Sequence, residues 1–223
     1  MQTEAKTSFY LDISIDCKKK YVREMKKGIF IVFEGLDGSG KSIQITMLRD
    51  WLKKKRISAI ITKEPTDNIT GNILKLTLRM EKLAPQTDAL LFAADRAEHI
   101  DKIIKENLKK GKVIIQERYV YANIAYQTAQ GVSERFVKNI NDFAMKPDLV
   151  FLLDVPAELA LQRNWNVLYF TPGKFEKSIQ FNERVRKKYL ELAKKYALHV
   201  IDATKPQEEI FEEVIKKVSQ FLS

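Results

Sequence analysis

Short apolar runs alternate with amphipathic stretches along most of this 223-residue chain. The runs are continuously apolar and rich in β-branched residues, which is typical of strands that are buried on both faces. They predict strands at Ile29–Glu34, Ser58–Thr62, Val113–Glu117, Leu149–Asp154 and Leu198–Asp202. The pattern therefore predicts an α/β fold, in which helices cover both faces of a five-stranded parallel sheet.

Between these runs, apolar residues recur at helical spacing. The clearest case is the last stretch, where Ile210, Val214 and Val218 lie on one face. The predicted helices are Lys41–Lys54, Gly71–Glu81, Thr87–Lys109, Ser133–Met145, Ala157–Arg163, Phe175–Tyr196 and Gln207–Leu222. We expect residues 28–223 to form a single domain, since a chain of this length can bury a substantial core.

Two segments do not follow the alternation. Residues 1–27 form an N-terminal extension, and three interpretations of it stay open: a flexible tail, an extra β element, or sequence upstream of a natural start at Met25. The second segment, residues 164–174, contains Pro172 and Gly173 and shows no clear period. A loop of this length in a compact domain is often a lid, and we expect a short lid here.

The charge balance is basic, with 39 Lys and Arg against 29 Asp and Glu, a formal net charge of +10. Such a charge fits nucleic acid or a small polyanion such as a nucleotide. The lysines fall on expected helix exteriors without interleaved aromatic residues, so a solvated basic surface is the simpler interpretation and a nucleic-acid partner is not expected.

The composition also bears on location. No apolar run approaches the roughly 20 residues of a membrane-spanning helix, so no membrane association is expected. A lone cysteine, Cys17, excludes an intrachain disulfide. We expect a reducing, cytoplasmic location.

The strongest motif is Gly35–Ser42, which matches G-x-x-x-x-G-K-[ST] between a predicted strand and a predicted helix. Its glycines allow backbone conformations that aim N–H groups at a phosphate, next to the positive end of a helix. Lys41 can reach the β- and γ-phosphates, and the Ser42 hydroxyl can bind Mg²⁺. The predicted ATP-binding residues are Gly35, Leu36, Asp37, Gly38, Ser39, Gly40, Lys41 and Ser42.

This P-loop predicts a phosphotransferase but does not identify the class. No [NT]-K-x-D motif follows a later strand, which weakens a GTPase, and an ATPase or helicase usually needs a longer chain. A small nucleotide or metabolite kinase is the class that remains.

The extended motif Phe33–Ser42 resembles the opening of thymidylate (dTMP) kinases. Further blocks match that family in the same order: Lys63–Pro65, Leu90–His99, Glu117–Gln127 and Pro147–Pro156. The resemblance covers about residues 25–222. It implies a P-loop NTPase three-layer fold, Mg²⁺-dependent transfer of the ATP γ-phosphate to dTMP, and a homodimer.

The resemblance also implies an acceptor site. Phe92 and Arg96, one helical turn apart, would stack on thymine and hydrogen-bond the base. Without the resemblance, Phe92 reads as a core residue and Arg96 as a surface ion pair. Tyr126 would lie against the deoxyribose, although Tyr126 and Gln127 alone read as a helix-packing pair. The full set of implied dTMP-binding residues is Asp37, Glu64, Phe92, Arg96, Arg118, Asn123, Tyr126 and Gln127.

Glu117 and Arg118 end a predicted strand, so both side chains should emerge at the carboxyl edge of the sheet, where α/β proteins bind ligands. By the resemblance, Arg118 grips the dTMP phosphate, while Glu117 and Ser42 hold the metal. The family usually has Asp where this chain has Glu117.

The expected catalytic residues are Lys41, Arg118 and Lys174. Family members carry a catalytic arginine either in the P-loop or in the lid, whereas this chain has Gly38 and no arginine in residues 164–174. Lys174 stands where the lid arginine is expected, and lysine lacks the planar bidentate fork. Arg163 matches the family arginine that packs on adenine.

Three alternatives stay open. A divergent paralogue could phosphorylate another nucleoside monophosphate. A nucleotide-binding regulatory protein with little turnover would explain the arginine-poor lid. A basic nucleic-acid binder is the weakest of the three.

Overall fold

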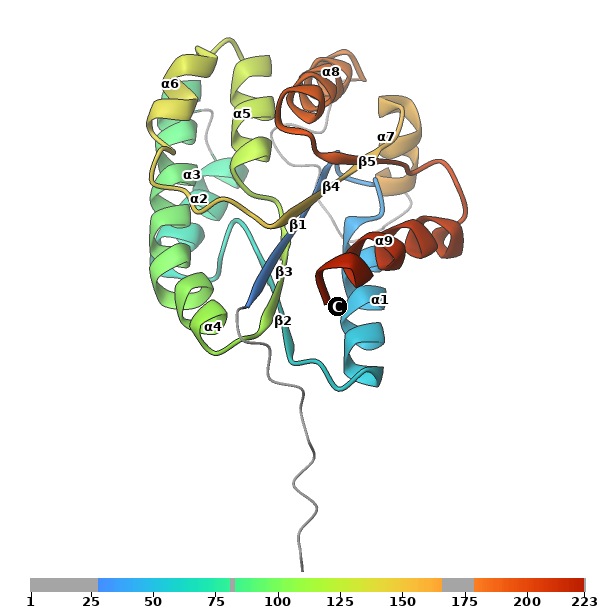
Figure 1. Ribbon diagram of the computed structural model, residues 1–223. Coiled ribbons are helices and arrows are strands. Elements are labelled where there is room, and N and C mark those ends of the chain that lie inside the picture. Colours follow the sequence, from blue (N-terminus) through green and yellow to red (C-terminus); the bar gives the residue numbers. More distant parts are fainter. Residues whose placement is uncertain (1–27, 81–82, 166–178, 223) are drawn as a thin grey trace, which may run out of the picture.

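The computed structural model describes residues 28–80, 83–165 and 179–222. Within these ranges, five parallel strands form one sheet in the order β2-β3-β1-β4-β5 (Figure 1). The strands are β1 (Ile29–Gly35), β2 (Ala59–Lys63), β3 (Val113–Glu117), β4 (Leu149–Asp154) and β5 (His199–Asp202). The predicted α/β fold with a five-stranded parallel sheet is confirmed.

Strand β1 lies at the centre of the sheet and is buried along its whole length. Ile31 pairs with Ile115 of β3 on one side and with Leu149 of β4 on the other. The ring of Phe33 packs against that of Phe151, with centroids 5.0 Å apart. The carboxyl end of β1 is therefore held on both sides, which fixes the start of the loop that follows it.

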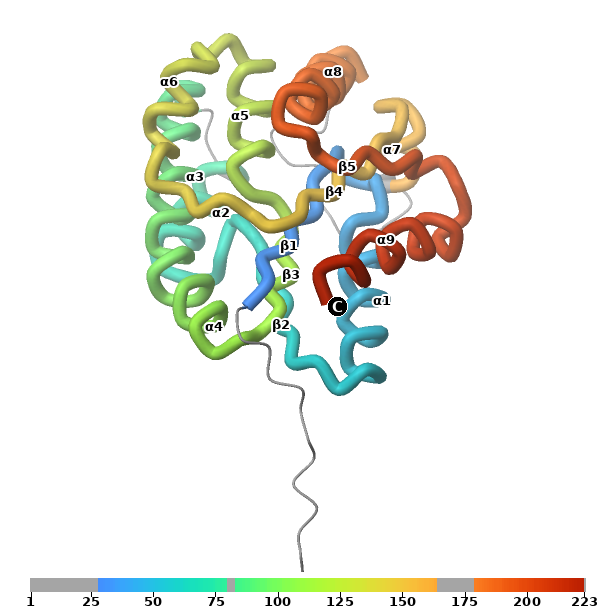
Figure 2. Tube along the Cα trace, in the orientation of Figure 1, coloured from blue at the N-terminus to red at the C-terminus, as the bar shows by residue number. Residues whose placement is uncertain are grey.

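Helices cover both faces of this sheet. They are α1 (Lys41–Lys54), α2 (Ile69–Met80), α3 (Pro85–His99), the π-helical turn η1 (Ile100–Ile104), α4 (Lys105–Lys109), α5 (Val120–Ala129), α6 (Glu134–Asn139), α7 (Ala157–Trp165), α8 (Ile179–Tyr196) and α9 (Gln207–Leu222). Helices α1 and α9 pack together on one face, and α3, α5 and α8 lie on the other (Figures 1 and 2). The result is a three-layer arrangement with β1 in the middle.

The predicted helices are wrong at two places. Helix α5 is absent from the prediction because its sequence is rich in β-branched and aromatic residues and is buried almost all round, so it has no solvent-exposed face. A fully buried helix cannot be told from a strand by periodicity alone. The predicted helix Ser133–Met145 ends at Asn139, and turns follow it.

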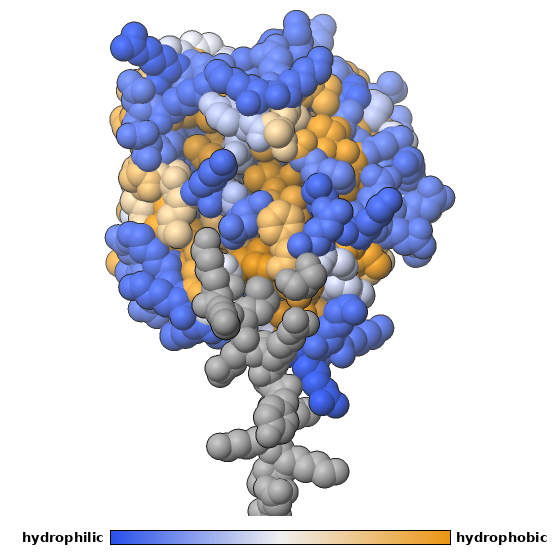
Figure 3. All heavy atoms as spheres, in the orientation of Figure 1, coloured by the Kyte–Doolittle hydropathy of each residue, from blue (hydrophilic) through white to orange (hydrophobic). Residues whose placement is uncertain are grey.

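Four predictions fall wholly or partly outside the described ranges. They concern the extension 1–27, most of the lid 164–174, the first residues of the helix Phe175–Tyr196 and the last residue of the helix Gly71–Glu81. None of the helices in the described ranges is long and apolar enough to cross a membrane. On the face drawn in Figure 3, hydrophilic residues surround a central hydrophobic area, as expected for polar helix exteriors around a packed sheet.

The P-loop packs directly against α7 at Gly38. This glycine has a φ of +84°, and a Cβ added to it would lie 2.1 Å from the carbonyl oxygen of Ala160. Any larger residue would therefore have to displace the loop or the helix. This contact explains why Gly38 cannot be an arginine while α7 keeps this position.

We predict that Gly38→Ala destabilises the chain more than Gly131→Ala does. Both glycines have positive φ, but no atom lies within 4 Å of a Cβ added at Gly131. Gly131→Ala should cost about 1–2 kcal/mol of backbone strain, and the clash with Ala160 should add about 1–3 kcal/mol. Urea unfolding measures both losses, and equal losses would contradict the contact.

Candidate active site

The loop Gly35–Gly40 leaves the central strand β1 and leads into α1. Gly35, Gly38 and Gly40 all have positive φ, and Gly40 is the N-cap of α1. No side chain caps this helix, and its first turn contains no acidic residue. The first N–H groups of α1 and its positive dipole end are therefore available to an anion.

Lys41 is buried beneath this loop. Its ammonium donates hydrogen bonds to the carbonyl oxygens of Gly35 and Leu36, at 3.2 and 2.8 Å. The carboxylates of Asp37 and Glu117 lie 3.8 and 4.0 Å away. Burial lowers the pKa of Lys41, and the neighbouring Arg118 lowers it further, against the two carboxylates. The Lys41 ammonium is thus held at the P-loop, where a phosphate would lie.

Ser42 and Glu117 meet at the carboxyl edge of the sheet, as the sequence predicts. The Ser42 hydroxyl donates to Oε2 of Glu117 at 2.9 Å, so glutamate at this position does reach the serine. Among residues 28–80, 83–165 and 179–222, no cluster of three or more His, Cys, Asp or Glu could hold a metal. A hydroxyl beside one carboxylate fits Mg²⁺, which takes few ligands from the protein and keeps waters and phosphate oxygens.

Arg118 joins the P-loop to α5. Its backbone has a φ of +62°, and its N–H donates to the carbonyl oxygen of Phe33 at 2.9 Å. Its guanidinium pairs with Asp37, donates to the Tyr126 hydroxyl at 3.3 Å and lies 5.0 Å from the centre of that ring. A positive φ at a non-glycine residue is uncommon, and here it aims the guanidinium back over the loop.

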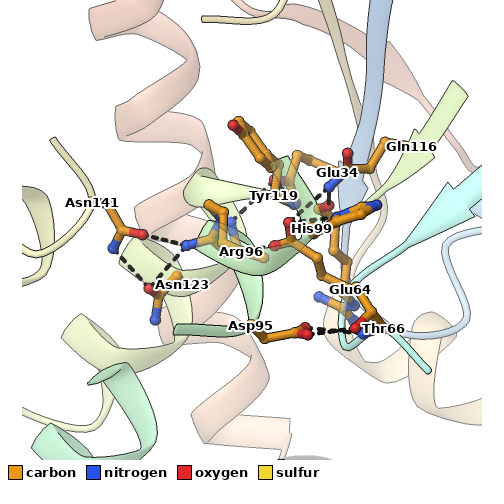
Figure 4. A network of polar contacts seen from close by, with 12 residues as sticks. Glu34, Glu64, Thr66, Asp95, Arg96, His99, Gln116, Tyr119, Asn123 and Asn141 are labelled. Atoms are coloured by element: carbon orange, nitrogen blue, oxygen red, sulfur yellow. Dashed lines mark hydrogen bonds and ion pairs between the residues drawn. The ribbon is translucent and has the colours of Figure 1, made fainter. Parts of the chain in front are cut away.

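Arg96 of α3 lies in a buried polar network between α3 and α5 (Figure 4). Its Nη2 donates to Glu64 at 2.7 Å, and its Nη1 donates to the side chains of Asn123 and Asn141. The interpretation of Arg96 as a surface ion pair is therefore wrong, because this ion pair is buried. Phe92, one turn earlier on α3, is only half-buried, so it is not a core residue either.

Comparison with known proteins agrees with this geometry. The family model described as thymidylate kinase matches residues 33–214. A probable thymidylate kinase of Methanocaldococcus jannaschii is 47% identical over 193 residues, 86% of this chain and 96% of the relative. One of Thermococcus gammatolerans is 40% identical over 203 residues, 86% and 97% of the two chains. The thymidylate kinase of Brachyspira hyodysenteriae is 38% identical over 195 residues, 87% and 95%. The chain belongs to the thymidylate kinase family.

As a member of the thymidylate kinase family, the chain is an ATP-dependent phosphotransferase. The matched range includes every predicted site residue, from Gly35 to Lys174. Lys174, the predicted lid cation, lies outside the described residues. All the other predicted site residues are described.

In this member of the thymidylate kinase family, two buried polar residues beside the predicted site residue Glu64 are absent from the sequence-based list. His99 shares a hydrogen bond with Glu64 (Nδ1 to Oε1, 3.1 Å) and another with Thr62 (Nε2 to Oγ1, 2.6 Å). Gln116 donates to the same Glu64 oxygen at 3.1 Å. The position of His99 in the matching block Leu90–His99 was the only available signal.

Asp95 braces the loop after the cis peptide Glu64–Pro65. It accepts hydrogen bonds from the backbone N–H and the hydroxyl of Thr66, at 2.9 and 2.5 Å. Asp95 therefore holds this loop against α3.

Glu34, the residue before the P-loop, is also missing from that list. Its buried carboxyl accepts hydrogen bonds from the N–H groups of Tyr119 and Ala122 at 2.9 and 3.2 Å, and from the Tyr189 hydroxyl at 2.9 Å. Burial raises the pKa of Glu34 to about 7, against the nearby Arg118 and these donors. One side chain of β1 thus binds the start of α5 and the middle of α8.

Helices α7 and α8 are held by contacts to the loop after β5 and to the end of β4. Arg163 donates to the carbonyl oxygen of Ala203 at 2.7 Å. Arg186 of α8 forms a bidentate ion pair with Asp154 at the end of β4, at 2.7 and 2.9 Å. These contacts anchor the helices on both sides of the predicted lid.

We predict that Glu34→Gln changes the pH dependence of stability. A carboxyl whose pKa rises from 4.5 to about 7 on folding binds more protons in the folded chain, so it makes the chain less stable as pH rises through this window. Between pH 5 and pH 8, the wild-type free energy of unfolding should fall by about 2.5 kcal/mol more than that of the variant. Urea unfolding at both values measures this, and parallel pH profiles would contradict it.

Proposed function

We propose that this chain transfers the γ-phosphoryl group of ATP to dTMP, giving ADP and dTDP. The observation that carries this proposal is the position of Arg118. Its guanidinium lies between Asp37 of the P-loop and Tyr126 of α5. A fixed guanidinium at the border of a triphosphate cradle and a second pocket suits the phosphate of an acceptor nucleotide. Family membership and the names of the relatives support dTMP as that nucleotide.

The acceptor base and sugar would lie between α3 and α5. Phe92 would stack on thymine, Arg96 would hydrogen-bond the base, and Tyr126 would lie against the deoxyribose. Asn123 and Gln127 extend this polar lining along α5. Glu64 would act through Arg96, since its carboxylate holds that guanidinium in place.

The donor nucleotide would bind at the P-loop, with its phosphates on the N–H groups of residues 35–42. Lys41 would exchange its two carbonyl contacts for phosphate oxygens. Ser42 and Glu117 would hold Mg²⁺, which neutralises charge on the β- and γ-phosphates when bound. Arg163 would pack on adenine, and its bond to the carbonyl of Ala203 supports a base site beside the loop after β5.

Catalysis would consist of positioning and charge neutralisation. Lys41 and Arg118 would hold the donor and acceptor phosphates in line, and no covalent intermediate is required. Residues 164–174 would form a lid over ATP that excludes water, with Lys174 as the lid cation near the transferred group. The domain would then be residues 28–223, with residues 1–27 as an extension.

We also propose that the enzyme is a cytoplasmic homodimer. Helix α2 exposes Ile69, Ile73 and Leu76, which are spaced by one helical turn along one side, and the neighbouring α3 exposes Leu90. A second copy of the chain would cover this stripe. Analytical ultracentrifugation of Ile73→Glu should show a monomer, while Phe221→Glu, at an exposed residue of α9, should remain a dimer. A monomeric wild-type chain would contradict the proposal.

A panel of acceptors tests the proposed reaction. ADP release should be fastest with dTMP among dTMP, dUMP, dCMP, dGMP and AMP. Lys41→Ala should lower turnover about 10³-fold or more, because it removes the buried cation of the cradle. Lys53→Ala, at an exposed residue of the same helix, is the matched control and should keep normal turnover.

Three outcomes of this panel would count against the proposal. Faster transfer to another monophosphate would favour a divergent paralogue. ATP binding without turnover on any acceptor would favour a regulatory protein. Near-normal activity of Lys41→Ala would refute the assigned cradle.

A further inference from the structure

A chain of hydrogen-bonded side chains runs through the acceptor side of the site. It leads from the carbonyl oxygen of Val137 through Asn141 and Asn123 to Gln127, and Arg96 lies beside it. All four side chains are at least 96% buried. Figure 4 shows Arg96 with Asn123 and Asn141 on one side and Glu64 on the other. Asn141 belongs to no matched sequence block and has no role in the proposal above.

This series of hydrogen bonds begins at the carbonyl oxygen of Val137, which can only accept. Val137 lies in the last turn of α6, where backbone carbonyls lack a partner within the helix. Nδ2 of Asn141 donates to this carbonyl at 2.8 Å and to Oδ1 of Asn123 at 2.9 Å. Oδ1 of Asn141 accepts from Nη1 of Arg96. The orientation of the Asn141 amide is therefore fixed by the main chain.

The orientation of the Asn141 amide in turn fixes the orientations of the Asn123 and Gln127 amides. Oδ1 of Asn123 accepts from both Asn141 and Arg96, the latter at 3.3 Å, so its two acceptor positions are filled. Nδ2 of Asn123 must then point away, and it donates to Oε1 of Gln127 at 2.8 Å. Reversing one amide would set donor against donor or acceptor against acceptor at its junctions, at about 1–3 kcal/mol for each buried group left unpaired.

Two N–H groups of Gln127 and Arg96 remain without a partner in this network, and both are donors. Nε2 of Gln127 is buried and has no hydrogen-bond partner among the described residues. Nε of Arg96 is in the same state, while its Nη1 and Nη2 are taken by the two asparagines and Glu64. Buried N–H groups are rarely left unpaired, so these two atoms indicate a ligand that offers acceptors.

We propose that Asn141 is a positioning residue for base selection: through Asn123 it fixes Gln127 so that the pocket presents N–H donors to the base. A pyrimidine with a 4-oxo group places an acceptor at position 4 of the ring, whereas one with a 4-amino group places a donor there. This inference rests on the proposed function, because it takes the acceptor pocket as the base site. Tyr126, adjacent to Gln127, links the pocket to Arg118 and the phosphate site.

The matched pair of acceptors is dTMP and 5-methyl-dCMP. Both carry the 5-methyl group, so the difference lies in the hydrogen-bonding edge of the base, where a carbonyl and an N–H in dTMP become an amino group and a bare nitrogen. A 4-amino group would face the Gln127 amide donor to donor. The wild-type chain should therefore favour dTMP in kcat/KM by about 100-fold or more.

Asn141→Asp tests the relay, since aspartate has the same shape but only accepts. It cannot donate to Val137 or to Asn123, and the Asn123 amide should turn to donate to it. Gln127 would then turn as well and present Oε1 to the base. The ratio of kcat/KM for dTMP to that for 5-methyl-dCMP should fall at least about tenfold, mainly through the KM for dTMP. Asn139→Asp, at an exposed position two residues away, is the matched control and should keep the wild-type ratio.

A merely structural role for Asn141 would lower turnover with both acceptors and leave their ratio unchanged, and that result would overturn the proposal. If Asn141→Asp does not fold, Gln127→Glu tests the proposal instead. It places an acceptor directly at the position of Nε2, the atom of Gln127 that has no partner among the described residues. This variant should also shift the ratio toward 5-methyl-dCMP, and an unchanged ratio would again refute the polarity argument.

The proposed function and the base selection can fail separately. A wild-type chain that transfers phosphate to neither acceptor would contradict the proposed function. Calorimetric binding of dTMP and 5-methyl-dCMP to the wild type and to Asn141→Asp would then decide base selection. Preferential binding of dTMP that Asn141→Asp reduces would support it, and equal binding to the wild type would overturn it.

Discussion

Glu34 occupies the position of β1 next to Gly35, and its buried carboxyl receives three hydrogen bonds from two other elements. The N–H groups of Tyr119 and Ala122 belong to the start of α5, and the hydroxyl of Tyr189 belongs to α8. A buried carboxyl without such partners would cost several kcal/mol. The strand that carries the P-loop is therefore tied to α5, which carries the proposed acceptor residues Asn123, Tyr126 and Gln127.

Arg118 makes the second connection between these halves. It follows β3, pairs with Asp37 in the P-loop and covers the ring of Tyr126 on α5. The approach of two phosphate groups, each negatively charged, is the main electrostatic obstacle to phosphoryl transfer. In the proposed mechanism, the Arg118 guanidinium and the Lys41 ammonium would lower that obstacle, because both cations already lie beside the P-loop.

The sequence predicts the central part of the molecule well and its polar interior poorly. Strands β3 and β4 were found because each begins with an unbroken run of apolar residues, and the P-loop was found because its spacing is specific. Helix α5 was missed because it is buried almost all round. Glu34 and Asn141 were missed because a single buried polar residue leaves no periodic signal, and their partners lie far away in sequence: Glu34 and Tyr189 are 155 residues apart. Only the fold brings such residues together.

A crystal structure of the chain with dTMP and a non-hydrolysable ATP analogue tests the central claim most directly. The account predicts that the dTMP phosphate takes the place of Asp37 on the Arg118 guanidinium. It also predicts that the base carbonyl lies within hydrogen-bond distance of Nε2 of Gln127 or Nε of Arg96. A dTMP phosphate away from Arg118, or a base outside the pocket between α3 and α5, would contradict the account.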